Sequence, residues 1–267
     1  MSAQASYSIT PLLAPLGSRR RPGRSIPDVK FIVAHDTGNA GASARGHARF
    51  YRNDPNPPLN KVSSAHIFVD DEDIVETVPA LTASPEQALH VLRSVPTDNL
   101  IFGVDANAAA IGVELCYGGT IDADAAYDRF VWTLATLCKT FNLDPAHRIV
   151  GHQVLDPERR SDPDNALSRS GRSYAQLLVD VPARFGQVNG MSGLIGSAAI
   201  VAGNARATVN LNRREAASGT SARTGAFRPG DPVAVTKIVP GQKVMGIDLW
   251  CQLPEGDFCW SGGLVQP

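Results

Sequence analysis

The strongest constraint on the fold is an alternation of short apolar runs with helical patterns. Runs at 30–35, 63–69, 74–78, 109–116 and 147–150 are typical of strands, and the turn at 70–73 joins two of them as a hairpin. Apolar side chains then recur at helical spacing behind a capping Asp122 or Asp124: Phe130, Val131, Leu134, Leu137, Cys138 and Phe141. Further helices are expected over 41–52 and 173–185, with 80–108 irregular. This order predicts an α/β domain.

Composition divides the chain into four parts. Residues 1–27 are rich in Ser, Pro, Arg and Gly and are expected to form an N-terminal arm, whose Arg19–Arg21 cluster favours a solvated segment over a binding patch. The α/β domain is expected over 28–187. Residues 188–205 are rich in Gly, Ser, Ala and Val, as in a linker. Residues 206–267 carry short strand patterns, which predict a small all-β module.

Charge and cysteine content exclude several classes of protein. The net charge of −1 over 267 residues gives no reason to expect nucleic acid or an anionic membrane as a partner. No apolar run reaches the roughly 20 residues that span a bilayer, and the N-terminus lacks the pattern of a secretory signal. The 4 cysteines form no C-x-x-C pair; we expect Cys116 and Cys138 to be reduced and buried.

Two histidines stand at corresponding places, each closing an apolar strand. His35 ends the run at 30–35, and His152 follows the run at 147–150. Asp162 lies ten residues beyond His152, in a loop that could return it to the same place. If the two strands are neighbours, these three side chains converge. Two imidazoles and one carboxylate with an open fourth position are the ligands of a catalytic zinc ion.

Glu114 is the second unusual residue, because it lies in the middle of an apolar strand. A buried carboxylate without a partner is costly, so it is either paired, at the edge of the sheet, or functional. On a period of two, Gly112 shares its face and leaves space beside it. Glu114 could act as a general base toward a zinc-activated water, or form a salt bridge with a neighbour such as Arg148.

These residues fall within four separated motifs, which occur in the order His35-Asp36-Thr37-Gly38, Ser64-Ala65-His66 with Val69-Asp70, Asn107 with Ile111-Gly112-Val113-Glu114, and Gly151-His152 through Arg160-Ser161-Asp162-Pro163. Over about residues 25–185 the chain resembles the zinc-dependent N-acetylmuramoyl-L-alanine amidases of the amidase-2 family. That family includes peptidoglycan recognition proteins and phage-lysozyme-like enzymes. The resemblance implies a mixed central β-sheet flanked by helices, zinc bound by His35, His152 and Asp162, and Glu114 as catalytic base.

The resemblance also assigns further residues and shows departures. Arg160 stands where the family usually has a Lys that helps to stabilise the oxyanion, and Arg can donate there with different geometry. His66, His90 and Asn107 are candidate substrate-binding residues, and His66 is expected to pack or hydrogen-bond under the site rather than to bind the metal. The family often carries Trp-His-Ala-Gly ahead of the Glu strand. Here the corresponding segment is Ala88-Leu89-His90-Val91.

The C-terminal residues resemble a bacterial SH3-like domain, a module that commonly binds cell-wall peptides. The resemblance rests on Val209–Arg214, Phe227–Val233, Trp250 and the segment around Trp260. A three-residue hairpin loop at Pro254-Glu255-Gly256 would set Cys251 opposite Cys259, as a disulfide or as a reduced pair. The tryptophans could belong to the core or form a ligand platform.

Together these features predict a two-domain hydrolase that cuts the bond between N-acetylmuramic acid and L-alanine in peptidoglycan. A non-catalytic peptidoglycan-binding protein and a zinc peptidase acting within the stem peptide are the alternatives. Action on the cell wall after release by a non-standard or phage-type route is expected, ahead of cytoplasmic recycling.

Overall fold

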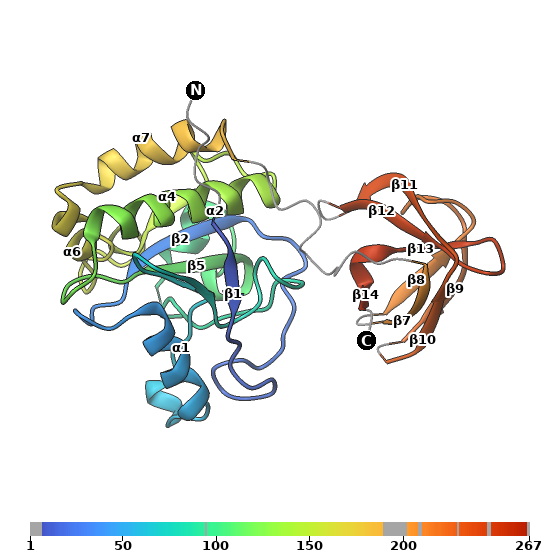
Figure 1. Ribbon diagram of the computed structural model, residues 1–267, viewed down its shortest axis with the longest axis horizontal. Coiled ribbons are helices and arrows are strands. Elements are labelled where there is room, and N and C mark those ends of the chain that lie inside the picture. Colours follow the sequence, from blue (N-terminus) through green and yellow to red (C-terminus); the bar gives the residue numbers. More distant parts are fainter. Residues whose placement is uncertain are drawn as a thin grey trace. The chain divides into compact units, whose positions relative to one another are not determined.

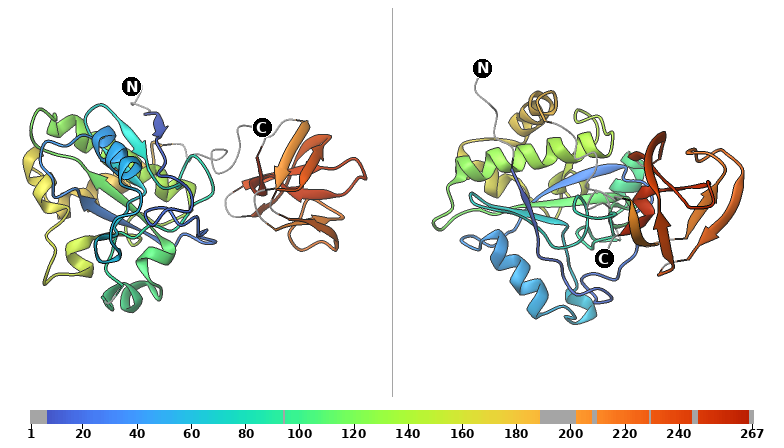
Figure 2. Two further views of the ribbon diagram at one scale, coloured as in Figure 1. Left: turned by 90° about the horizontal axis from the view of Figure 1, so that it is seen from below. Right: turned by 45° about the vertical axis from the view of Figure 1, so that its right-hand side comes forward.

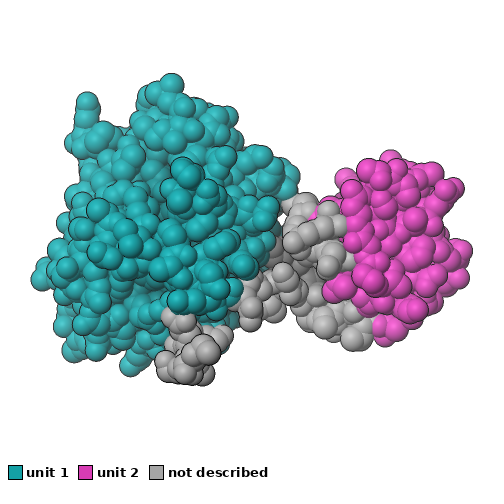
Figure 3. Space-filling model, turned by 90° about the horizontal axis from the view of Figure 1, so that it is seen from above, with its two compact units in different colours: residues 1–190 teal, residues 191–267 magenta. Residues whose placement is uncertain are grey.

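The chain forms two compact units, residues 1–190 and 191–267 (Figure 3). The computed structural model describes residues 7–93, 95–188, 202–207, 210–228, 230–244 and 247–265. Most of the expected linker, residues 189–201, lies outside the described residues. Over the described ranges, no helix has the length and apolar character needed to cross a bilayer.

A mixed sheet forms the centre of the first unit, as expected. Its strands over the described residues have the order β1-β4-β3-β5-β2-β6, with bounds Ile9–Pro11, Ile74–Glu76, Ile67–Val69, Ala110–Leu115, Phe31–Asp36 and Ile149–Gly151. The strands β3, β5, β2 and β6 run parallel, and β3 and β4 form the expected antiparallel hairpin. All six residues of β2 are buried, which explains the unbroken apolar run Phe31–Ala34 at its start.

Helices cover both faces of this sheet (Figure 1). The long helix α4 (Ala123–Thr140) begins at Asp122, whose side chain accepts hydrogen bonds from the backbone N–H groups of Asp124 and Ala125. It contacts β2, β3 and β5, and α7 (Tyr174–Phe185) packs against it. On the opposite face, α1 (Ala44–Asn53) buries Ala44, Ala48 and Tyr51 against Phe68. That second face carries the functional cleft described below.

The segment 80–108 is more ordered than the sequence predicts. It contains α2 (Thr97–Phe102) and α3 (Ala106–Ala109). Helices this short show no apolar period, and side-chain acceptors stabilise them instead. Asp105 caps α3 through the Asn107 N–H, and the buried Asp98 accepts from the Ala106 N–H.

The N-terminal segment packs into the first unit, and the expectation of a solvated arginine cluster is wrong for Arg20 and Arg21, while Arg19 is exposed. Residues of β1 extend the sheet beside β4, where Pro11 is tolerated because β1 is an edge strand. Arg20 is 3% exposed and donates to the carbonyls of Asp54 and Ser63 and to the Asp54 carboxylate. Arg21 forms a bidentate ion pair with Glu86. For Arg20 and Arg21, charge-assisted hydrogen bonds to acceptors in the protein therefore replace the hydration of the guanidinium groups.

The remaining short elements of the first unit are η1 (Leu59–Lys61), α5 (His152–Leu155), α6 (Asp164–Leu167) and η2 (Ser168–Ser170). The last three follow β6 along the chain. The region after His152 was expected to be a polar loop, and in the structure it contains several short helical turns.

The second unit is all-β, as expected, and its strands are seen from two sides in Figure 2. Over the described residues it contains two antiparallel sheets, β10-β7-β14 and β11-β12-β13-β8-β9. The bounds from β7 to β14 are Gly203–Ala207, Leu211–Arg214, Arg223–Phe227, Pro232–Val235, Lys237–Val244, Ile247–Gln252, Phe258–Trp260 and Leu264–Val265, with η3 at Ser261–Gly263. Strand β9 was not expected, because its sequence, Arg-Thr-Gly-Ala-Phe, lies in a Gly/Ser/Thr-rich stretch.

The expected pairing of two cysteines occurs in the core of this unit. Cys251 on β12 lies directly opposite Cys259 on β13, and both side chains are fully buried as free thiols. Trp250 is also buried, and its indole N–H donates to the Gln242 carbonyl. Cys116 and Cys138 in the first unit are buried and reduced, as expected.

Candidate metal centre and cleft

One row of residues across the parallel strands brings the candidate site together. His35 on β2 lies directly opposite Glu114 on β5, and Glu114 lies opposite Phe68 on β3. On the other side of β2, Ala34 pairs with Gly151 of β6, so the next residue, His152, follows the same row. Paired residues of adjacent strands present their side chains on one face of a sheet, roughly 5 Å apart. The register of the strands therefore places His35, Glu114 and His152 close together.

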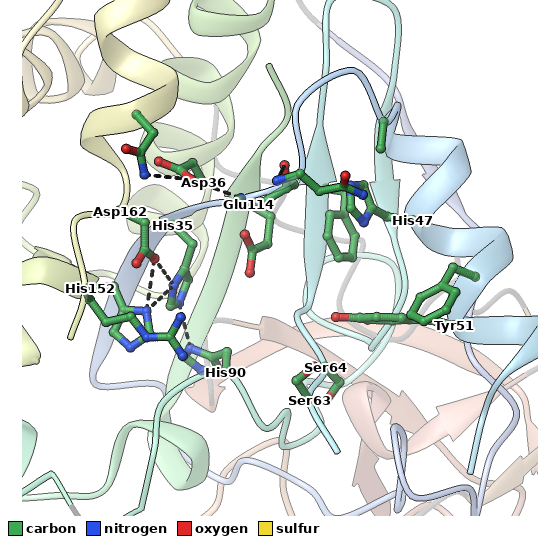
Figure 4. A pocket seen from close by; sticks show the side chains of 18 of the residues that line it. His35, Asp36, His47, Tyr51, Ser63, Ser64, His90, Glu114, His152 and Asp162 are labelled. Atoms are coloured by element: carbon green, nitrogen blue, oxygen red, sulfur yellow. Dashed lines mark hydrogen bonds and ion pairs between the residues drawn. The ribbon is translucent and has the colours of Figure 1, made fainter. Parts of the chain in front are cut away.

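The third group, Asp162, returns to this row through the region after β6. Its Oδ2 atom lies 2.9 Å from Nδ1 of His35 and 3.0 Å from Nδ1 of His152. The two Nδ1 atoms are 3.0 Å apart. The Gln153 N–H donates to the Asp162 carbonyl, and this bond joins the start and the end of the segment 153–162. All three side chains are buried and converge, as Figure 4 shows.

Asp36 holds the segment that follows Asp162. The sequence did not predict a role for it. Its carboxylate accepts from the backbone N–H of Gly38 and of Ala166 in α6. The end of β2 is thereby tied to the helix that follows Asp162. In the sequence, the indication of a role for Asp36 was its position directly after His35.

The protonation states of these groups suit a metal. Burial lowers the pKa of His35 to about 4, which leaves the imidazole neutral at pH 7. Burial raises the pKa of Asp162, but the hydrogen bonds from His152 and His35 outweigh it and hold the pKa well below its usual range. Neutral imidazoles and an ionised carboxylate are the forms that bind cations.

The chemistry of the donor set provides a separate test of fit. Three lone-pair atoms lie within 3.0 Å of one another in a buried place. A neutral imidazole can place one proton at Nδ1, and two such protons aimed at one Oδ2 atom would crowd each other. A cation would satisfy all three lone pairs at once. Two His nitrogens and one carboxylate oxygen are a known catalytic zinc set with an open position.

Glu114 lies beside this cluster with no partner of its own. Its Oε2 atom is buried without a hydrogen bond, and among the described residues no ion pair involves it. The alternative of a salt bridge to Arg148 is therefore not formed. Burial raises the pKa of Glu114 well above its usual value, and the negative charges of Asp162 and Asp36 raise it further, against Arg160. A carboxylate in this setting takes up a proton readily.

Three other candidates occupy different positions. His90 lines the cleft, and its Nδ1 lies 3.0 Å from Nε2 of His35. His66 is fully buried beneath it, accepting from the Gly112 N–H and contacting the Glu86 carbonyl at 2.8 Å. Asn107 is buried too, and its side chain bonds the backbone of His90 and Val91. His66 and Asn107 thus lie below the cleft wall, where they support His90.

The cleft itself has a volume of about 690 Å³ and extends from the metal cluster to α1. Arg160 is exposed and lines it on the side of Asp162. The opposite wall includes His47, Phe50 and Tyr51 of α1, whose roles were not predicted from the sequence. Figure 4 shows His47 and Tyr51 across the cleft from His35 and His152. His47 and Tyr51 are four residues apart, which places both on one face of a helix, and this spacing could have indicated from the sequence that they lie together.

Comparisons with known proteins agree with this geometry. Residues 25–165 match the family model described as N-acetylmuramoyl-L-alanine amidase. N-acetylmuramoyl-L-alanine amidase BlyA of Bacillus subtilis (strain 168) is 33% identical over 145 residues, which are 52% of this chain and 38% of that protein. A probable N-acetylmuramoyl-L-alanine amidase of Bacillus licheniformis is 35% identical over 134 residues, or 49% of this chain and 36% of that protein. The chain therefore spans little more than a third of the length of these relatives.

A solved structure gives the same result for the fold. A mutant endolysin from Bacillus subtilis superposes with a TM-score of 0.52 at 25% identity, covering 66% of this chain and 99% of that one. The similarity thus covers about the length of the first unit.

Proposed function

Residues 25–165 make this chain a member of the N-acetylmuramoyl-L-alanine amidase family, and on that premise we propose that it hydrolyses the amide bond between N-acetylmuramic acid and L-alanine in peptidoglycan. The observation that carries the proposal is the convergence of His35, His152 and Asp162 beside an unpartnered Glu114. That arrangement combines a cation site with a base, which is what metal-assisted amide hydrolysis requires.

We propose zinc as the metal, held by Nδ1 of His35, Nδ1 of His152 and a carboxylate oxygen of Asp162. When bound, zinc supplies a Lewis acid that polarises the scissile carbonyl and acidifies water. The three ligands and the open fourth position favour a catalytic ion over a closed structural one.

Glu114 is proposed as the general base. It removes a proton from the attacking water and returns one to the leaving L-alanine nitrogen. Arg160 is proposed to donate hydrogen bonds to the carbonyl oxygen as negative charge develops there. The hydroxyl of water ends on the lactyl carbonyl carbon and the proton on nitrogen. The products are a free muramic acid carboxylate and a stem peptide that begins at L-alanine.

Action on the intact cell wall is part of the proposal. The all-β unit is proposed as an SH3-like module that binds wall peptides, over residues 206–267, joined by a linker at 188–205 to a catalytic domain over 28–187. An anchor of this kind suits an insoluble polymer, because it raises the effective concentration of the catalytic unit at the wall.

The decisive test is the identity of the products. Purified protein is incubated with muropeptides, with and without a chelator, and the products are identified by mass spectrometry. Free stem peptide starting at L-alanine, formed only without chelator, is the expected result.

The other outcomes select the alternatives. Cuts only within the stem peptide would replace the amidase with a zinc peptidase. Absence of turnover by protein that retains zinc and binds muropeptides would favour a recognition protein. Turnover that persists in chelator at full rate would remove the metal from the reaction.

A further inference from the structure

We propose that His90 is a positioning residue that selects the tautomer of His35, so that Nδ1 of His35 faces the metal. The inference rests on the proposed metal site and concerns a residue that the sequence suggested only as a substrate contact. Its basis is a chain of two imidazoles: Nε2 of His35 lies 3.0 Å from Nδ1 of His90 (Figure 4).

The protons on this pair follow from which atoms face the cluster. Nδ1 of His35 points to Asp162 and His152, so a metal held there requires its lone pair. The proton of the neutral ring must then be on Nε2. The hydrogen-bond partner of Nε2 among the described residues is Nδ1 of His90, which therefore accepts. A partner at the second ring nitrogen commonly fixes the orientation and tautomer of a ligating histidine.

The surroundings restrict the His90 ring at the place where its Nδ1 meets Nε2 of His35, while its own Nε2 is buried without a hydrogen-bond partner among the described residues. Gly112 lies against the ring, and a Cβ atom at Gly112 would come within 2.7 Å of His90 Cγ. The Asn107 side chain fixes the His90 backbone by accepting its N–H at 2.8 Å. The ring of His66 packs edge-on against His90, with the centroids 5.6 Å apart. Three neighbours thus restrict a ring that also lines the cleft.

This arrangement explains why Gly112 precedes Glu114 on β5. The sequence indicated that Gly112 leaves space beside the carboxylate. In the structure the space is taken by His90, whose ring occupies the volume that a side chain at Gly112 would need. Both Gly112 and Asn107 therefore act on the metal through His90.

The test measures zinc affinity, by competition between the metal-free protein and a chromogenic zinc chelator. His90→Phe keeps the ring shape and removes the acceptor, and we expect zinc affinity to fall about 10–100-fold. His90→Asn restores an acceptor near the position of Nδ1, and we expect most of the affinity to return. Gly112→Ala should displace the ring and weaken zinc binding in the same direction. Gly186→Ala is its control, because a Cβ there meets nothing closer than 4.0 Å.

Several results would overturn the proposal. Wild-type zinc affinity in His90→Phe would do so, as would equal losses in His90→Asn and His90→Phe with unchanged melting of the metal-free proteins. If these variants do not fold, nitrogen NMR of ¹⁵N-histidine-labelled wild-type protein with zinc decides the matter. Protons at Nε2 of both His35 and His90 are expected, and a proton on Nδ1 of His90 would refute the assignment. None of these measurements uses peptidoglycan, so they stand apart from the test of the amidase reaction.

Discussion

At the scale of single residues, the site depends on two carboxylates with opposite properties. Asp162 Oδ2 lies within 3.0 Å of two imidazole nitrogens and has a depressed pKa, whereas Glu114 has an unpartnered Oε2 and a raised pKa. The first stays ionised and suits a cation; the second takes up a proton and suits a base. The different roles of the two carboxylates arise from their neighbours, since both line the same cleft.

The Glu114→Gln variant tests this division. The amide is similar in shape but cannot take a proton, so we expect turnover of muropeptides to fall by about 100–10,000-fold. Zinc affinity should stay within a few-fold, because Glu114 is not among the three converging donors. Retention of more than a tenth of the activity would remove Glu114 from its assigned role. Asp162→Asn is the contrasting variant, in which zinc affinity itself should fall.

The convergence of residues in and after the strands could be predicted from the sequence, whereas the positions of the residues beneath the cleft could not. His35, His152 and Glu114 stand in or directly after apolar runs that the sequence identifies as strands, and the register of these strands brings the three residues together. His90 and His66 depend on the path of residues 80–108, which has no apolar period and is fixed by side-chain acceptors such as Asp98 and Asn107. Such contacts have no signature in a single sequence.

At the scale of elements, the N-terminal segment was the main difference from expectation. Three-residue strands such as β1 fall below the length at which an alternating pattern can be recognised. Arg20 looks like any cation of a basic cluster, yet its guanidinium lies over the rings of Phe50 and Tyr51 and bonds the chain at Asp54 and Ser63. It joins the segment before β2 to the C-terminal end of α1.

The Arg20→Met variant should therefore destabilise the first unit. It leaves carbonyl acceptors and the Asp54 carboxylate without their cation, at a cost of about 2–4 kcal/mol in the free energy of unfolding. The melting temperature should fall by roughly 5–15 °C. Arg24→Met, which removes the same charge from an exposed side chain, is the control. Equal stability of the two variants would contradict the structural role.

In the second unit, β8 and the β12–β13 hairpin are joined by a charge pair that predicts a pH dependence. Arg213 donates to both carboxylate oxygens of Asp257, at 2.7 and 3.0 Å, and thereby lowers the Asp257 pKa. A depressed pKa means that the unfolded chain binds a proton more readily. The contribution to stability is therefore full above the ordinary Asp pKa of about 4 and is lost as the pH falls below it.

The Arg213→Met variant should lower the free energy of unfolding of this unit by about 1–3 kcal/mol at pH 7. The difference from wild type should shrink as the pH falls below the ordinary Asp pKa of about 4 and through the lowered pKa of folded Asp257. Of the 3 tryptophans, Trp250 and Trp260 lie in this unit, so fluorescence in a Trp132→Phe background follows it alone. A pH-independent difference would refute the assignment. Arg228→Met, with an exposed side chain, is the control.

At the scale of the whole molecule, the chain forms two compact units, residues 1–190 and 191–267, and its composition changes close to the point where they divide, after residue 186. Each unit has its own buried core. Strand pairing inside the second unit was less predictable, since β9 contains Gly225 and no alternating apolar pattern.

Metal binding should consequently stabilise one unit only. A ligand at 1,000 times its Kd adds about 4 kcal/mol to the free energy of unfolding of the unit that binds it. Zinc should raise the transition followed by Trp132, and chelator should reverse the change. The transition followed by Trp250 and Trp260 in the Trp132→Phe background should not move. A zinc-dependent shift of that second transition would place a metal outside the cluster described here.

The row of residues across the sheet also bears on how the protein matures. His35 lies 117 positions before His152 and 127 before Asp162, and β6 pairs with β2 only after the whole intervening chain has been made. Loop closure over that distance is entropically costly, and a chain that ends before β6 contains only one of the three converging donors, His35. A chain that ends before β6 therefore lacks two of the three proposed zinc ligands, His152 and Asp162, and is expected to bind no metal at this place.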